Sequence, residues 1–180
     1  MTVLLGIDGG FAAMGYAVAS WDNDHLDVLE MGLLETKKSA RKVPVSEDND
    51  RRARLLCRKL LNIVFGHEID GICSESMSFP PSSSASCKLC LSRGVVDAVA
   101  EIHLISTVQK SPQDIKMAAA GSRTASKGQI RAALSMHYPS SMEAFEKAGV
   151  TASKAEHCWD ALGAIVACLD TDIVRALVKR

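Results

Sequence analysis

The order of short apolar runs along the chain constrains the fold more than any other feature. Three strand-length runs lie close together near the start, at Val3–Asp8, Met14–Ser20 and His25–Leu34. Runs so close in sequence favour antiparallel pairing, because a tight turn is enough to join antiparallel neighbours. The first run ends in Asp-Gly-Gly, which is typical of a buried strand that stops at a turn. The chain is therefore expected to begin with a three-stranded meander.

Helical and strand patterns alternate after this meander. The expected elements are a polar loop over 36–50, helices over 47–65 and 85–102, strands over 69–75 and 103–108, and further helices over 112–120, 126–137 and 154–169 and up to 178. Strand–helix–strand crossovers give parallel pairing. We therefore expect an α/β fold with a five-stranded mixed sheet, three antiparallel strands then two parallel ones, and helices on both faces. The length of 180 residues suits one domain over 1–180.

Composition excludes several classes of protein. No apolar run approaches the roughly 18–20 residues that cross a bilayer, and the start of the chain lacks the features of a secretory signal. We expect a cytoplasmic protein with no membrane contact. The six cysteines have no regular spacing and are expected to be thiols. Cys87 and Cys90 form a lone CxxC pair without the other ligands that a structural zinc site needs.

Charge is distributed unevenly along the chain. The net charge of zero argues weakly against a nucleic-acid-binding protein. However, Lys37–Lys59 contains nine basic and three acidic residues, and Lys110–Arg131 contains five basic residues and one acidic residue. Each segment alone is typical of a solvated helix face. Two such segments that flank a constellation of acidic residues favour an anionic partner.

Two of these acidic residues end predicted strands. Asp8 ends the first strand and Glu75 ends the fourth. Sites in open α/β sheets form outside the carboxyl ends of strands, so the two carboxylates meet if these strands are neighbours. Such a pair repels itself unless cations lie between the two groups. Hard divalent ions, above all magnesium, are the natural partners of clustered carboxylates.

The helix expected over 154–169 carries a second polar group. His157 and Asp160 are three residues apart, and Glu156 and Asp160 are four apart, so either pair can share a helix face. The rest of this helix is apolar, so the polar group suggests a functional role. An ordinary helix N-terminus, where acidic residues favour the macrodipole, is an equal alternative.

Four segments in order resemble motifs of the RuvC family of Holliday-junction resolvases, a branch of the RNase H-like superfamily. Gly6-Ile7-Asp8-Gly9-Gly10 is similar to the family's opening motif, with Gly9 where the family usually has proline. The other segments are Glu75 with Leu89 and Ser92-Arg93-Gly94, Ile115-Lys116 with the stretch 121–130, and Glu156–Gly163. His157 stands where many members have an additional aspartate. The resemblance spans nearly the whole chain.

The resemblance implies an active site and a reaction. Its metal ligands would be Asp8, Glu75, His157 and Asp160, which would hold two Mg²⁺ ions, with Mn²⁺ as a substitute. The implied reaction is two-metal hydrolysis of a phosphodiester, leaving 5′-phosphate and 3′-hydroxyl ends. The expected function is the resolution of four-way DNA junctions by paired nicks.

The resemblance also implies contacts with DNA and with a second subunit. An apolar residue in the loop after Glu75 would wedge between bases, although core packing is an equal alternative for Met77 and Phe79, and strict spacing places the family's aromatic at Ser78. The helix over 85–102 would form a homodimer with two-fold symmetry that matches the junction. The DNA-contacting residues would be Met77, Phe79, Lys88, Arg93, Lys116, Arg123 and Lys127.

Three other functions are weighed against this one. A phage-type nuclease that cuts forks and flaps with little sequence preference fits the same residues. A junction-binding protein without cleavage is possible if His157 marks a lost ligand. A nucleotide-binding domain like those of actin and sugar kinases also begins with a strand ending in Asp-x-Gly. It needs a second phosphate loop and a longer chain, which makes it the weakest alternative.

Overall fold

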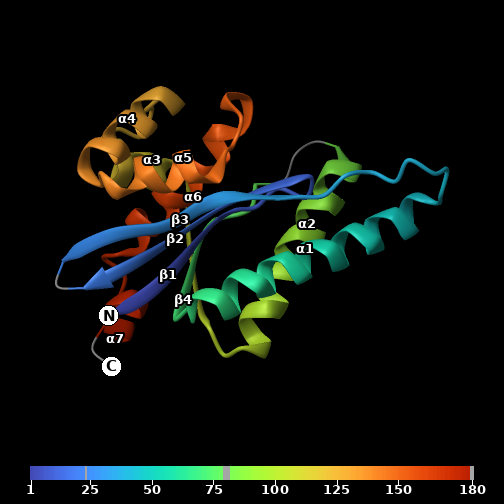
Figure 1. The fold of residues 1–180 in the computed structure, drawn as a ribbon, viewed down its shortest axis with the longest axis horizontal. Helices are drawn as coiled ribbons and strands as arrows, with labels where there is room; N and C mark the ends of the chain where they lie inside the picture. Colours follow the sequence, from blue (N-terminus) through green and yellow to red (C-terminus); the bar gives the residue numbers. More distant parts are fainter. Residues whose placement is uncertain (23, 79–81, 179–180) are drawn as a thin grey trace.

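A five-stranded mixed sheet forms the centre of the protein in the computed structural model, which describes residues 1–22, 24–78 and 82–178 (Figure 1). The strand order is β3-β2-β1-β4-β5. The first three strands pair antiparallel, and β4 and β5 continue the sheet in parallel with β1. The strands are β1 (Thr2–Asp8), β2 (Ala13–Asp22), β3 (His25–Glu35), β4 (Gly71–Glu75) and β5 (Ser106–Lys110). The predicted sheet is confirmed.

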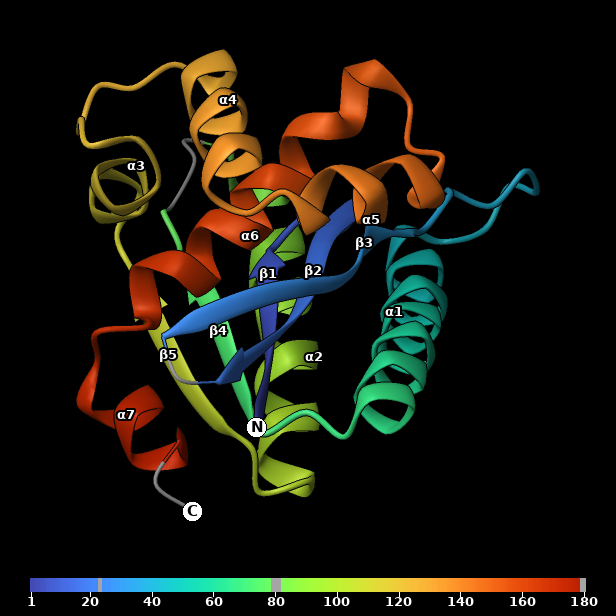
Figure 2. The ribbon, with the colours of Figure 1, turned by 60° about the vertical axis from the view of Figure 1, so that its left-hand side comes forward.

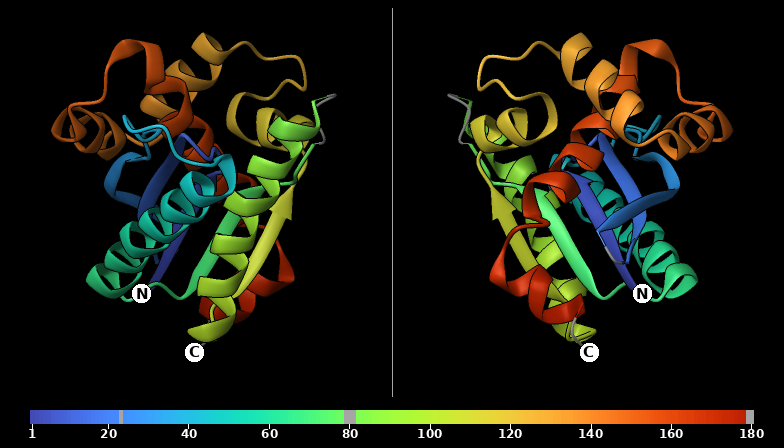
Figure 3. Two further views of the ribbon diagram at one scale, coloured as in Figure 1. Left: turned by 90° about the vertical axis from the view of Figure 1, so that its right-hand side faces the viewer. Right: turned by 90° about the vertical axis from the view of Figure 1, so that its left-hand side faces the viewer.

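Helices cover both faces of this sheet. Figure 2 and the two views of Figure 3 show α1 and α2 on one face, and α6 with the α3–α5 segment on the other. The helices are α1 (Val45–His67), α2 (Ser83–Ile102), α3 (Pro112–Ala120), α4 (Lys127–His137), α5 (Ser140–Ala148), α6 (Ala155–Cys168) and α7 (Asp172–Val178), with a 3-10 turn η1 (Ala152–Lys154) before α6. In the described part of the chain, no helix is long and apolar enough to cross a membrane.

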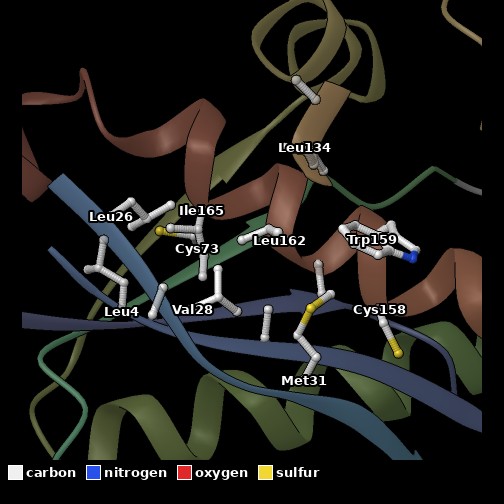
Figure 4. Close-up of a cluster of buried hydrophobic side chains, with 14 of the residues drawn as sticks. Leu4, Leu26, Val28, Met31, Cys73, Leu134, Cys158, Trp159, Leu162 and Ile165 are labelled. Carbon is white, nitrogen blue, oxygen red and sulfur yellow. The ribbon is translucent and has the colours of Figure 1, made fainter. Parts of the chain in front are cut away.

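Alternating strand residues supply two separate cores. Leu4 and Cys73 point to the α6 face, where they pack with Trp159, Leu162 and Ile165 (Figure 4). The neighbouring strand residues Leu5, Ile7 and Ile72 point to the other face and pack against α1 and α2. Burial on both faces explains why the first strand is a nearly continuous apolar run and why even Ser74 of the fourth is buried. It also holds the ends of these strands in fixed positions.

Two elements differ from the sequence-based expectation. The last strand was predicted over 103–108 but lies at Ser106–Lys110. His103 instead caps α2 by donating its backbone N–H to Val99, and Leu104 then turns the chain with a φ of 54°. Helix α5 was not predicted at all. It packs on β3, and the hydroxyl of its Ser140 accepts a hydrogen bond from the backbone N–H of Val28.

Candidate active site

The ends of β1 and β4 bring Asp8 and Glu75 to the same edge of the sheet. The two strands are parallel neighbours, with Ile7 opposite Ser74 in the register. Asp8 follows Ile7 on β1 and Glu75 follows Ser74 on β4, so the two acidic residues lie next to each other at the strand ends. Both side chains are partly buried and both line one pocket between the strand ends and α2. The predicted meeting of these two carboxylates is thus present in the structure.

Helix α6 approaches the same edge because two glycines leave room for it. A Cβ atom on Gly6 would lie 2.0 Å from the backbone oxygen of Ala161, and one on Gly15 would lie 2.1 Å from that of His157. Either distance is impossible for a real side chain, so the helix backbone rests directly on β1 and β2. This close approach carries His157 and Asp160 to the ends of the strands.

The α6 residues make direct contacts at this edge. His157 Nδ1 lies 2.7 Å from Asp8 Oδ2, and the ammonium group of Lys127 forms an ion pair with Asp160. Glu156 is exposed to solvent. The sequence left open whether Glu156 or His157 completes the group, and the orientation of α6 favours His157.

Mutual repulsion and burial change the acidity of these groups. Burial raises the pKa of Glu75, and the negative charges of Asp8 and Asp160 raise it further. Burial also raises the pKa of Asp160, against the opposing effect of Lys127. The hydrogen bond to Asp8 raises the pKa of His157. The edge therefore concentrates negative charge that a cation would stabilise.

The raised pKa of Glu75 predicts a pH-dependent gain in stability for the Glu75→Gln variant. A carboxyl group with a raised pKa binds more protons in the folded state than in the unfolded state, so stability falls as the pH rises through that window. Without metal, Glu75→Gln should melt at a higher temperature than the wild type near pH 8. The difference should close as the pH falls towards the ordinary pKa of 4.5.

Thermal melts in EDTA over a pH series measure this difference. Glu101→Gln, an exposed carboxylate near the end of α2, is the matched control and should follow the wild type. A wild type more stable than Glu75→Gln at alkaline pH would contradict the predicted charge repulsion.

The donor chemistry of the site suits a hard divalent cation. Carboxylate oxygens and an imidazole are ligands that Mg²⁺ and Mn²⁺ accept. Among the described residues, which include all four expected ligands, no three acidic, histidine or cysteine side chains are grouped closely enough to hold an ion. Lys127 engages Asp160 and His157 engages Asp8 instead. The residue types fit a metal, and their side chains would have to exchange these contacts to bind one.

The expected DNA-contacting residues differ in how near they lie to the acidic edge. Lys116 and Lys127 are near enough to Glu75 to lower its pKa, against the larger effects that raise it. Met77 lines the pocket beside Asp8 and Glu75. Phe79 lies outside the described residues. The other three contact neighbouring side chains. Lys88 donates a hydrogen bond to Ser84 at 3.2 Å, and Arg93 donates one to Ser74 at 2.7 Å. Arg93 also forms an ion pair with Asp97 at 2.8 Å, and Arg123 forms one with Asp114 at 3.8 Å.

The pocket has polar residues that the sequence analysis did not assign to the site. Ser74 and Ser76 flank Glu75 in its wall, and the buried hydroxyl of Ser92 has no hydrogen-bond partner among the described residues. Serines in a strand or helix carry no pattern of their own, so only the fold assembles them.

Comparisons with known proteins agree with this arrangement. The sequence model of the family described as crossover junction endodeoxyribonuclease RuvC matches residues 4–138. The RuvC of Prochlorococcus marinus (strain MIT 9312) is 30% identical over 127 residues, which cover 71% of this chain and 76% of that protein. The RuvC of Alkaliphilus metalliredigens (strain QYMF) is 23% identical over 129 residues, covering 72% and 74%.

Solved structures match a larger share of the chain. Thermus thermophilus RuvC, solved in complex with a Holliday junction substrate, superposes with a TM-score of 0.73 at 19% identity, covering 93% of this chain and 92% of that one. The yeast mitochondrial Holliday junction resolvase Ydc2 gives 0.67 at 13% identity, covering 98% and 80%. At these identities, the superpositions show a shared fold.

The fold is RNase H-like, and carboxylates gather at one edge of its sheet. The chain belongs to the RuvC family of crossover junction endodeoxyribonucleases. The resemblance stated from the motifs is thereby confirmed. The family match includes Asp8 and Glu75 and ends before α6, so the placement of His157 and Asp160 rests on the structure.

Proposed function

We propose that this protein resolves four-way DNA junctions by paired, metal-dependent nicks that leave 5′-phosphate and 3′-hydroxyl ends. One observation carries the proposal. Two carboxylates, Asp8 and Glu75, end neighbouring parallel strands, and a third, Asp160, is brought to them by α6. Residues 1–180 would act as a single nuclease domain.

Asp8, Glu75, His157 and Asp160 would hold two divalent ions, Mg²⁺ with Mn²⁺ as a substitute. These ions would supply an activated water and stabilise the departing 3′ oxygen. The side chains would first exchange their present contacts. Asp8 would turn from His157, and Asp160 would turn from Lys127. The semi-buried position of Glu75 favours charge neutralisation by a cation over solvation.

Lys127 would then be free to hold the scissile phosphate. Its side chain is 54% exposed while the carboxylate it contacts is 11% exposed, so the ammonium group lies on the solvent side of the site. A lysine is a compact charge suited to a phosphate oxygen. Lys116 and Arg123 would extend this contact along the strand that is cut, and Lys88 and Arg93 would contact DNA from α2. Met77, or Phe79 two residues later, would wedge into the opened junction.

We further propose that the protein is a homodimer that assembles through α2. One side of this helix exposes small residues, namely Cys87, Cys90, Gly94 and Ala98. They recur every three or four residues, so they share a helix face on which a second helix can approach closely. A dimer with two-fold symmetry would place one site on each of two symmetric strands of the junction.

Cleavage of a labelled synthetic four-way junction tests the function directly. The junction is compared with a replication fork and a linear duplex, each with magnesium, manganese or EDTA. We expect symmetric nicks in the junction only, with either metal and not with EDTA. Equal cutting of the fork would favour the broader branched-DNA nuclease. Binding without cutting in both metals would show a non-cleaving junction-binding protein and overturn the enzyme assignment.

A further inference from the structure

A strongly basic surface lies on the opposite side of the site from Lys116 and Lys127. Two adjoining depressions form it, and they share Lys38 and Ser39 in their walls. We call them together the basic groove. It runs along the β3–α1 connection, the start of α1 and the first turns of α2. Its cations are Lys37, Lys38, Arg41, Lys42, Arg51, Arg52, Lys59 and Lys88.

Half of these cations are not engaged by the fold. The two carboxylates in the walls are engaged, Glu35 by Lys154 and Asp48 by Arg51. By contrast, Lys37, Lys38, Arg41 and Lys42 are exposed and form no ion pair within the described residues. Apart from the attraction of Lys37 for Glu35, cations gathered in this way repel one another, which favours an anionic partner for them.

The first part of the connection that carries these cations is anchored to α1. The buried Arg52 donates to the hydroxyl of Thr36 at 3.0 Å and stacks over the ring of Phe11, 4.5 Å from its centroid. The Ser39 backbone N–H donates to Asp48 at 2.9 Å, and Arg51 donates to the carbonyl of Lys37 at 2.6 Å. Residues 36–39, which have no regular secondary structure, are thus held against α1 beside the exposed Arg41 and Lys42.

The anchors also tie the groove to the active site. Phe11, over which Arg52 stacks, lies three residues after Asp8. On α2, Ser84 and Lys88 line the groove while Leu89 lines the pocket beside Asp8 and Glu75. Figures 1 and 2 show the β3–α1 connection extending to one side of the site edge, with α3 and α4 on the other side. Cations therefore flank the carboxylates on two sides.

We propose that the basic groove binds the phosphate backbone of a DNA arm next to the strand that is cut. This inference rests on the proposed function and adds a second contact surface to it. Binding the phosphates of the cut strand alone would require only the cations near Lys127. A branched substrate has further arms that leave the branch point at an angle, and a fixed row of unpaired cations can hold one of them through its phosphates.

The test compares two triple variants with equal loss of charge. Lys38→Ala/Arg41→Ala/Lys42→Ala removes three groove cations. Arg54→Ala/Lys147→Ala/Arg175→Ala removes three exposed cations that already pair with carboxylates and line neither depression. Binding to a labelled junction is measured in EDTA over a salt series, beside the wild type. Cleavage is measured with magnesium at saturating protein.

The groove variant should bind about 10- to 100-fold more weakly, and its slope of log K against log[salt] should be shallower by roughly 2 to 3. Its cleavage rate at saturation should match that of the wild type, because no residue of the acidic edge is changed. The control should keep the wild-type slope. Equal slopes for the two variants would overturn the inference while leaving the function intact. A wild type that neither binds nor cuts branched DNA would overturn both.

Discussion

Asp8→Asn is expected to lower junction cleavage by at least about 10³-fold while junction binding is retained. The substitution keeps the size and shape of the side chain and removes the negative charge that would hold the cation. An asparagine can still contact His157, which now lies 2.7 Å from the carboxylate of Asp8, so the local packing should survive. The cations that would hold DNA are untouched.

Single-turnover cleavage and a binding titration in EDTA measure the two effects separately. Asp170→Asn is the matched control, because that carboxylate is 96% exposed and pairs only with Arg175 among the described residues. The control should cut at the wild-type rate. Loss of both binding and cleavage in Asp8→Asn would indicate a structural role for Asp8, and full cleavage would show that it is not a ligand.

Gly6→Ala is expected to destabilise the protein by about 3 kcal/mol or more, because there is no room for one methyl group. The added Cβ would lie 2.0 Å from the backbone oxygen of Ala161 and 2.8 Å from the Ile165 side chain. Backbone at that distance cannot rotate away, so α6 must shift. A loss of this size lowers the melting temperature of a domain of this length by roughly 6–12 °C.

The same shift should reduce cleavage in whatever fraction stays folded, because α6 carries His157 and Asp160. Gly66→Ala is the control for an added methyl group. Nothing lies within 4 Å of its Cβ position on α1, and alanine there should stabilise the helix by about 0.5–1 kcal/mol. A Gly6→Ala protein with the melting temperature and activity of the wild type would show that α6 does not rest on β1 as described.

Strand ends were the most predictable part of the site. The apolar runs before Asp8 and Glu75 stop at these residues, and both strands end there in the structure. The boundaries of elements were harder to predict where apolar residues lie in a turn between two elements. Residues 103–105 belong to the end of α2 and the turn after it instead of the last strand. Helix α5 was missed although its apolar residues recur at helical spacing, because it is only nine residues long.

Local patterns could not decide which polar residue of α6 points into the site. Glu156 and His157 are neighbours, and both share a helix face with Asp160. The rotation of the helix on the sheet selects His157 and leaves Glu156 exposed. Local patterns were also insufficient to assign roles to the basic residues over 37–59. Its sequence shows a cluster of charge, but only the fold shows that Arg52 is a buried anchor while Arg41 and Lys42 are exposed.

The sequence by itself determined the family, the order of the strands along the chain and the two carboxylates at their ends. These features follow from patterns within a few residues, because a strand buried on both faces is an apolar run that stops where the strand ends. The tertiary structure decided the rest of the site. His157 contacts Asp8 across 149 residues of sequence, and Lys127 contacts Asp160 across 33. Those contacts depend on how closely α6 can approach two glycines, and no local pattern records the distance between elements that meet only when the chain folds.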